Sequence, residues 1–163
     1  MTKTIRNISL GIIALLIVFA IACKRVADPC LQTTNLSVAI GVYKPADTGT
    51  TGVDSVLPKA MIGYLANGWL QYNGAQDKKF YLRLDPKNDT CKWFISPDST
   101  SSGLDTITLV YSRQLSFLSQ SCGYRYNYFI ADVKWTFNRI DSIKIKNNIV
   151  DGTANVENIK IFY

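Results

Sequence analysis

The chain has 163 residues, a formal net charge of +6 and no histidine. The lack of histidine excludes Ser-His-Asp and Cys-His catalysis and histidine-bound zinc, because histidine is the commonest general base and metal ligand. Glutamate occurs once, as Glu157, and the other acidic residues are scattered aspartates. We therefore expect a protein that is not an enzyme and that binds no metal or cofactor.

The first 22 residues have the pattern of a secretory signal. Lys3 and Arg6 precede an apolar run at 8–22, which ends on small residues directly before Cys23. A basic head, a short apolar run and a small-residue exit are typical of a cleaved signal peptide, and the run is shorter than the roughly 20 residues of a spanning helix. The cysteine at the cut resembles the lipobox of bacterial lipoproteins. An uncleaved anchor and an ordinary signal peptide are the alternatives.

The lipobox resemblance implies a division of the chain and a cellular location. Residues 1–22 would be a lipoprotein signal peptide, Cys23 the lipidated N-terminus, 23–29 a tether and 30–163 the folded domain. No acidic run follows Cys23, so we expect a cell-envelope protein anchored in the outer membrane and facing the periplasm. After cleavage the net charge is about +4, without a basic stripe, so a nucleic-acid partner is not expected.

Alternating apolar and polar residues predict short strands through the rest of the chain. The first lies at 36–42, where Leu36, Val38, Ile40 and Val42 alternate, and a polar loop follows at 46–54. Further strands are expected at 59–65, 69–72, 80–84, 90–95, 105–112, 124–137, 142–146 and 158–163.

Turn signals separate these strands. Asn67-Gly68 predicts a hairpin, and 72–74 and 85–88 predict further turns. The long segment 124–137 is expected to bend near Ala131-Asp132. No helical period is sustained after residue 23, so the fold class that we predict is all-β, an antiparallel β-sandwich in a single domain.

Four cysteines bear on the compartment and on the fold. If Cys23 carries lipid, then Cys30, Cys91 and Cys122 remain, and an exported chain is expected to form a disulfide. Alternation places Cys91 on one strand face with Trp93 and Ile95, which favours a buried free thiol. Cys30 and Cys122 lie in loop-like segments and are easier to join. A bond between Cys91 and Cys122 closes a shorter loop and stays open as the alternative.

The segments FYLRLDPKNDTCKWFI, DTITLVYSRQLSFLSQSCGYRYNYF and NVENIKIFY appear in this order. Together they resemble a family of small uncharacterised lipoproteins from Bacteroidota over about Cys30 to Tyr163. This resemblance implies a disulfide between the positions of Cys30 and Cys122. It implies no enzymatic activity, because the family is a domain of unknown function.

Three tyrosines are the candidate ligand residues. Tyr124, Tyr126 and Tyr128 share one face of a predicted strand and could stack against sugar rings, although an ordinary aromatic sheet face is the reading that we favour. Asp85 and Asp89 flank a turn and could form a calcium loop or a carboxylate pair, but turn capping is favoured.

The sequence therefore predicts a lipid-anchored, non-catalytic interaction or assembly module of the cell envelope. Its partners would be the membrane, through the N-terminal lipid, and an envelope protein or glycan. The alternative is a module that binds carbohydrate or another envelope ligand through exposed aromatic residues. A glycosidase built on paired aspartates is the least favoured reading.

Overall fold

The computed structural model describes residues 29–45, 52–99 and 103–163, and this part of the chain contains strands and turns but no helix. The expected signal peptide and Cys23 lie outside the described residues. The strands are β1 (Ser37–Lys44), β2 (Val53–Asp54), β3 (Ala60–Tyr64), β4 (Trp69–Ala75), β5 (Lys79–Arg83), β6 (Thr90–Ser96), β7 (Asp105–Ser119), β8 (Gly123–Trp135), β9 (Ser142–Ile145), β10 (Ile149–Val150) and β11 (Ile159–Phe162).

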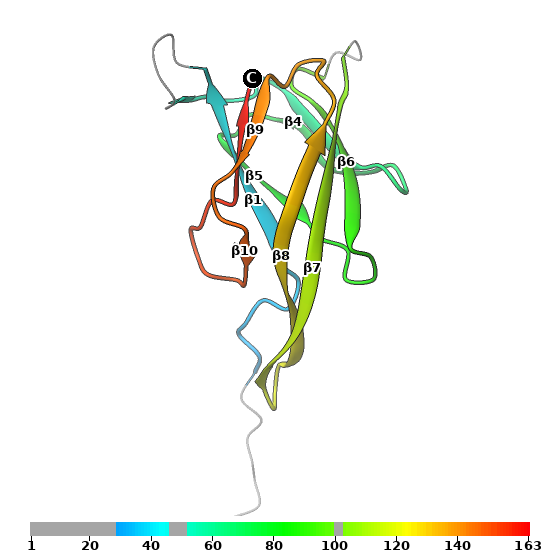
Figure 1. Ribbon diagram of the computed structural model, residues 1–163, viewed down its shortest axis with the longest axis vertical. Coiled ribbons are helices and arrows are strands. Elements are labelled where there is room, and N and C mark those ends of the chain that lie inside the picture. Colours follow the sequence, from blue (N-terminus) through cyan, green and yellow to red (C-terminus); the bar gives the residue numbers. More distant parts are fainter. Residues whose placement is uncertain (1–28, 46–51, 100–102) are drawn as a thin grey trace, which may run out of the picture.

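These strands form two sheets that pack face to face (Figure 1). One sheet has the order β2-β1-β11-β9, and β5 also pairs with β1. The other has the order β10-β8-β7-β6-β3-β4. All of the described strand pairs are antiparallel except one, since β1 and β11 run parallel. The predicted all-β sandwich is confirmed, with this one parallel pair as a departure from the antiparallel prediction.

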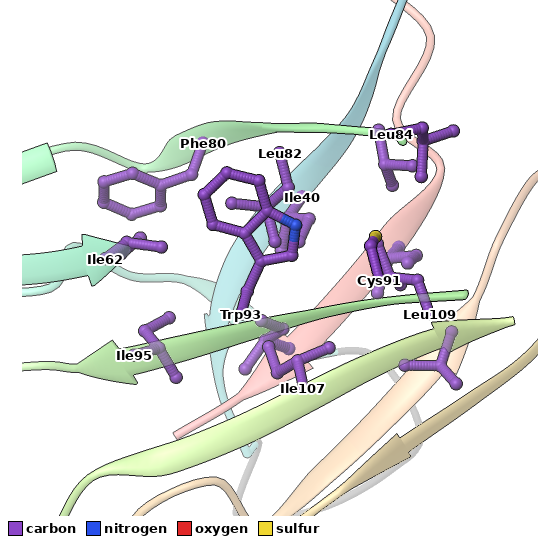
Figure 2. Packing of buried hydrophobic residues seen from close by; sticks show 14 of the residues in the cluster. Ile40, Ile62, Phe80, Leu82, Leu84, Cys91, Trp93, Ile95, Ile107 and Leu109 are labelled. Carbon is purple, nitrogen blue, oxygen red and sulfur yellow. The ribbon is translucent and has the colours of Figure 1, made fainter. Parts of the chain in front are cut away.

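The core lies between the two sheets (Figure 2). Trp93 on β6 is 1% exposed and points across the core toward Phe80 and Leu82 on β5 and Ile40 on β1. Alternation along each strand produces this arrangement, because every second side chain faces the opposite sheet. Burial of apolar side chains of this size contributes about 1.5 to 3 kcal/mol each and is the main stabilising term.

Each of the expected strands is present, but one expected turn is not. The hairpin at Asn67-Gly68 connects β3 to β4, as predicted. The segment 72–74 was expected to turn, yet β4 continues through it to Ala75. The pairing of β3 with β4 shifts at Gly74, whose φ is 73°. Glycine adopts this conformation readily, so Asn73-Gly74 forms a bulge within the strand.

The longest element is the β7–β8 hairpin. β7 extends seven residues beyond the predicted end at Ser112, to Ser119. The bend expected near Ala131 is a β-bulge, because Val110 pairs with Asp132 whereas Tyr111 pairs with Ile130. In Figure 1 the turn of this hairpin extends past the other strands, on the side where the described chain begins, and the C-terminus lies at the opposite end.

Candidate functional site

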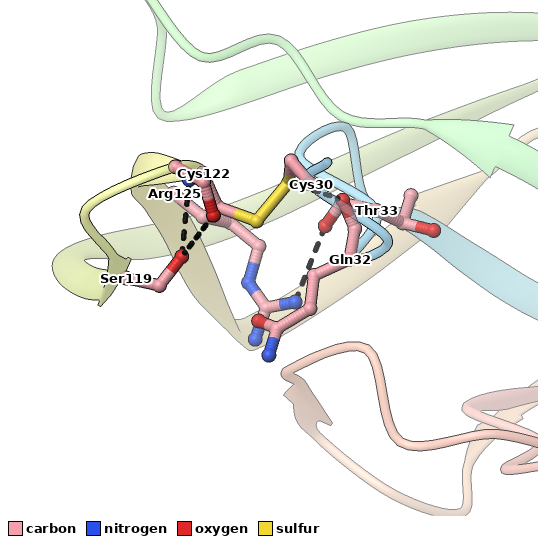
Figure 3. The surroundings of a disulfide bond; sticks show 7 residues. Cys30, Gln32, Thr33, Ser119, Cys122 and Arg125 are labelled. Atoms are coloured by element: carbon pink, nitrogen blue, oxygen red, sulfur yellow. Dashed lines mark hydrogen bonds between the residues drawn. A yellow bond between two sulfur atoms is a disulfide. The ribbon is translucent and has the colours of Figure 1, made fainter. Parts of the chain in front are cut away.

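The turn of the β7–β8 hairpin is linked covalently to the start of the described chain (Figure 3). Cys30 and Cys122 form a disulfide with a Cα–Cα distance of 4.9 Å, which is the pairing implied by the family resemblance. The hydroxyl of Ser119 accepts a hydrogen bond from the backbone N–H of Cys122 at 3.0 Å. The Arg125 guanidinium donates to the backbone oxygens of Thr33 and Asp151 at 3.2 and 2.7 Å. The N-terminal segment is therefore held against the hairpin.

The three predicted ligand tyrosines share one face of β8 but differ in exposure. Tyr124 is 63% exposed, Tyr126 is half-buried and Tyr128 is only 4% exposed. Tyr128 packs edge-on against Tyr111, with ring centroids 5.4 Å apart. Tyr128 belongs to the core, because this part of β8 faces the opposite sheet. Tyr126 still packs against the edge of the core, whereas Tyr124 lies beyond the sandwich, where the same face is uncovered.

A second aromatic cluster lines a cleft of about 180 Å³ between the two sheets. Tyr64 at the end of β3, Trp69 at the start of β4 and Trp93 on β6 supply its aromatic walls. The ring centroids of Tyr64 and Trp69 lie 5.2 and 6.4 Å from that of Trp93. Trp69 is 45% exposed, so part of its side chain is accessible from solvent. The volume lies below the roughly 300 Å³ of ordinary small-molecule pockets and suits a single ring.

Two charged groups complete this aromatic cleft. The guanidinium of Arg83 lies over the Trp69 ring, 5.6 Å from the ring centroid. The Asp85 carboxylate accepts hydrogen bonds from the backbone N–H of Lys87 at 2.8 Å and from the amide of Asn88 at 2.7 Å. These two bonds, the backbone one first, lower the pKa of Asp85, so it is ionised at neutral pH. The cleft thus combines a stacking surface with a cation and a carboxylate.

The Asp85–Asp89 turn is a capped turn. Asp85 caps the backbone as described, and the hydroxyl of Tyr64 also donates to it at 3.4 Å. Asp89 forms an ion pair with Arg113 at 2.8 Å. The two carboxylates therefore have separate partners: the turn-capping interpretation is confirmed for Asp85, whereas the Asp89 carboxylate pairs with Arg113 instead.

Cys91 is a buried free thiol on the core face of β6, alongside Trp93 and Ile95. Burial raises the pKa of this thiol to about 11. It is therefore protonated at neutral pH and is a poor nucleophile, because the thiolate is the reactive form.

In the described part of the chain, no three metal-ligating side chains of the His, Cys, Asp or Glu type gather at one place. The same residues include no helix long and apolar enough to span a membrane.

The aromatic cleft was not predicted from the sequence. Trp69, Arg83 and Trp93 come from three strands, and only the packing of β5 beside β3, β4 and β6 brings them together. Local patterns predicted that Trp69 and Trp93 lie in strands. They also placed Trp69 directly after the Asn67-Gly68 turn, where a large ring is often partly exposed. That position was the available signal.

Two packed sheets, the core between them and the disulfide define a small β-sandwich protein with an internal disulfide. Within this class, the chain belongs to a family of unknown function (DUF6452), whose match covers residues 52–163. The match includes Cys122 and the aromatic cleft but begins after Cys30 and β1. No curated protein and no solved structure matches the chain.

Proposed function

We propose that this protein is a lipid-anchored module of the bacterial cell envelope that binds a partner without catalysing a reaction. The proposal starts from Cys23, at the end of a signal-like segment. In this account Cys23 carries diacylglycerol, the domain faces the periplasm from the outer membrane, and the protein is one of the small lipoproteins of Bacteroidota.

The disulfide is the observation that carries this proposal. Disulfides persist in oxidising compartments and are rare in the cytosol, so the Cys30–Cys122 bond favours export. The bond also lies seven residues after Cys23. If Cys23 carries the lipid, the seven residues up to Cys30 form the tether between the lipid and the folded domain.

Fractionation of cells that express single-cysteine variants tests the anchor. Cys23→Ala should leave the protein as an uncleaved precursor or release it from the membrane fraction. Cys91→Ala is the matched control, because it also removes a thiol but should remain membrane-bound. Equal membrane association of mature Cys23→Ala and wild type would contradict the proposal.

The second candidate function is recognition of a sugar ring, and the aromatic cleft favours it. A ring stacked on Trp69 would place its hydroxyl groups beside Arg83 and Asp85, which supply a donor and an acceptor. Aromatic stacking with flanking polar groups suits a small polar ring in an otherwise apolar site. The cleft replaces the predicted tyrosine stripe as the better site for this function.

Titration of tryptophan fluorescence with soluble peptidoglycan and lipopolysaccharide oligosaccharides tests this candidate. Trp69→Ala should abolish the response, whereas Tyr124→Ala, which removes an exposed aromatic ring elsewhere, should preserve it. A response that survives Trp69→Ala but not Tyr124→Ala would assign binding to the hairpin instead.

A further inference from the structure

One face of the β7–β8 hairpin continues beyond the sandwich with large apolar side chains. Inside the sandwich this face buries Tyr111 and Tyr128. Further toward the turn it carries Leu115, 55% exposed, and Phe117, 59% exposed, opposite Tyr126 and Tyr124 in the strand register. The rings of Phe117 and Tyr124 lie 5.3 Å apart.

The start of the described chain adds another apolar side chain at this end of the molecule. Leu31 is 92% exposed and follows Cys30, which is bonded to the hairpin turn through Cys122 (Figure 3). We call Leu31, Leu115, Phe117 and Tyr124 the hairpin tip. Exposed apolar residues that cluster in this way mark interaction sites, whereas single ones are ordinary.

The chain length to Cys23 limits how far the tip can lie from the proposed lipid. Cys30 is seven residues after Cys23, and a fully extended chain spans at most about 3.5 Å per residue, or roughly 25 Å in all. The disulfide joins Cys30 to the hairpin turn directly. The tip is therefore the part of the described structure that is fixed close to the anchor.

The charge of the hairpin favours a lipid surface. No acidic residue occurs from Thr106 to Ala131, and the two charged residues there are Arg113 and Arg125. Four exposed side chains are also far fewer than the 20 to 30 residues per side of a stable protein interface. An anchored domain needs only weak apolar contact, because the tether keeps its tip at high effective concentration near the membrane.

We propose that the hairpin tip inserts into the interface of the membrane that holds the lipid anchor. Aromatic rings favour this zone, and apolar faces of peripheral proteins enter it by about 5 to 10 Å. Insertion of Phe117 and Tyr124 would orient the sandwich on the membrane. The inference rests on the lipid anchor proposed above.

Quenching by brominated lipid tests the insertion. The full lipidated protein would be reconstituted in vesicles of phosphatidylethanolamine and phosphatidylglycerol, with and without bromine near the headgroup end of the acyl chains. Phe117→Trp places a reporter in the tip, and Tyr124→Trp places a second one across the strand. Phe137→Trp is the matched control, because Phe137 is 75% exposed and follows the opposite end of β8, about 40 Å from the turn.

Most of the emission added by Phe117→Trp or Tyr124→Trp should be lost in brominated vesicles, and the emission added by Phe137→Trp should be retained. Equal quenching at both ends would overturn the inference. So would tip reporters that are shielded from aqueous iodide but insensitive to bromine, because a protein partner or a second copy would then cover the tip.

The mass of the same purified protein separates the two proposals. Lipidated protein whose tip reporters are not quenched overturns the insertion alone. Protein without diacylglycerol contradicts both, because the limit on the distance between tip and membrane then disappears.

Discussion

The Asp105 carboxylate organises the chain that follows β8. The residue is fully buried at the start of β7. It accepts hydrogen bonds from the hydroxyl of Thr136 and from the backbone N–H groups of Asn138, Arg139 and Ile140, at 2.7 to 2.9 Å. These donors replace the water that the carboxylate loses on burial, and they offset the cost of its desolvation.

Asp105→Ala should destabilise the protein by about 3 kcal/mol or more, because backbone donors that lose a buried acceptor cost about 1 to 3 kcal/mol each. Urea unfolding at neutral pH measures the change. Asp89→Ala is the control and should cost about 1 kcal/mol or less, because the Asp89–Arg113 pair has an exposed carboxylate. Equal losses in the two variants would contradict the role given to Asp105.

Stability should fall in alkali because of Cys91. Its pKa rises from 9.0 to about 11 on folding, so between these values the unfolded thiol loses its proton while the folded thiol keeps it. The thiol's contribution to the free energy of unfolding is complete below pH 9 and is lost as the pH rises to about 11. This contribution amounts to about 2 to 3 kcal/mol. Burial and Glu157 raise the pKa of Tyr43 to about 12, which acts in the same direction.

Comparison of wild type with Cys91→Ala isolates the thiol, since both proteins retain Tyr43. Thermal unfolding on fast scans at pH 9 and pH 11 limits thiol–disulfide exchange during the measurement. The wild type should lose more stability between these pH values than the variant does. Identical losses would show that the thiol does not titrate on unfolding in this range.

At the scale of elements, β11 is an inner strand of its sheet, between β1 and β9. It pairs parallel with β1 on one edge and antiparallel with β9 on the other. Ile159 is fully buried, whereas its register partner Ile145 on β9 is 40% exposed. The two isoleucines are therefore paired across neighbouring strands, but one is in the core and the other is in contact with solvent.

Ile159→Ala should cost about 2 to 5 kcal/mol, as expected for truncation of a buried isoleucine. Ile145→Ala should cost about 1 kcal/mol or less because the side chain already contacts water. Denaturant midpoints of the two variants provide the comparison. A larger loss at Ile145 would mean that β11 does not lie inside the sheet.

The disulfide joins the segment before β1 to the β7–β8 turn, across 92 residues of sequence. Its removal should cost about 4 to 5 kcal/mol in the chain-entropy account. Cys30→Ser, Cys122→Ser and the double variant should be destabilised equally, because each removes the same bond. Additive losses in the double variant would indicate that the two cysteines act independently.

Local patterns predicted most strands because alternation is a property of neighbouring residues. The segment 90–95 is one example, and its buried face of Cys91, Trp93 and Ile95 was predicted correctly. The two-residue strands β2 and β10 were missed, since pairing with β1 and β8 defines them. The parallel pairing of β1 with β11 also depends on contacts between distant parts of the chain.

The candidate sites were less predictable for the same reason. Alternation correctly placed Tyr124, Tyr126 and Tyr128 on one face but could not show where the opposite sheet ends. That boundary separates buried Tyr128 from exposed Tyr124. The aromatic cleft depends on side chains from both sheets and has no local signature.

At the scale of the whole molecule, the structure has two distinct surfaces. The hairpin tip lies at the disulfide, where the described chain begins, and the aromatic cleft lies between the β3–β4 hairpin and the turn after β5. A domain held at the first surface leaves the second available to a partner. This arrangement suits an anchored binding module and makes the N-terminal lipid the central claim of the account.

The intact mass of the protein purified from membranes tests that claim most directly. The account predicts a mature chain that starts at Cys23 and carries diacylglycerol, with the Cys30–Cys122 bond lowering the mass by two hydrogens relative to the reduced form. A mature chain that starts at another residue, or one that starts at Cys23 without lipid, would contradict it.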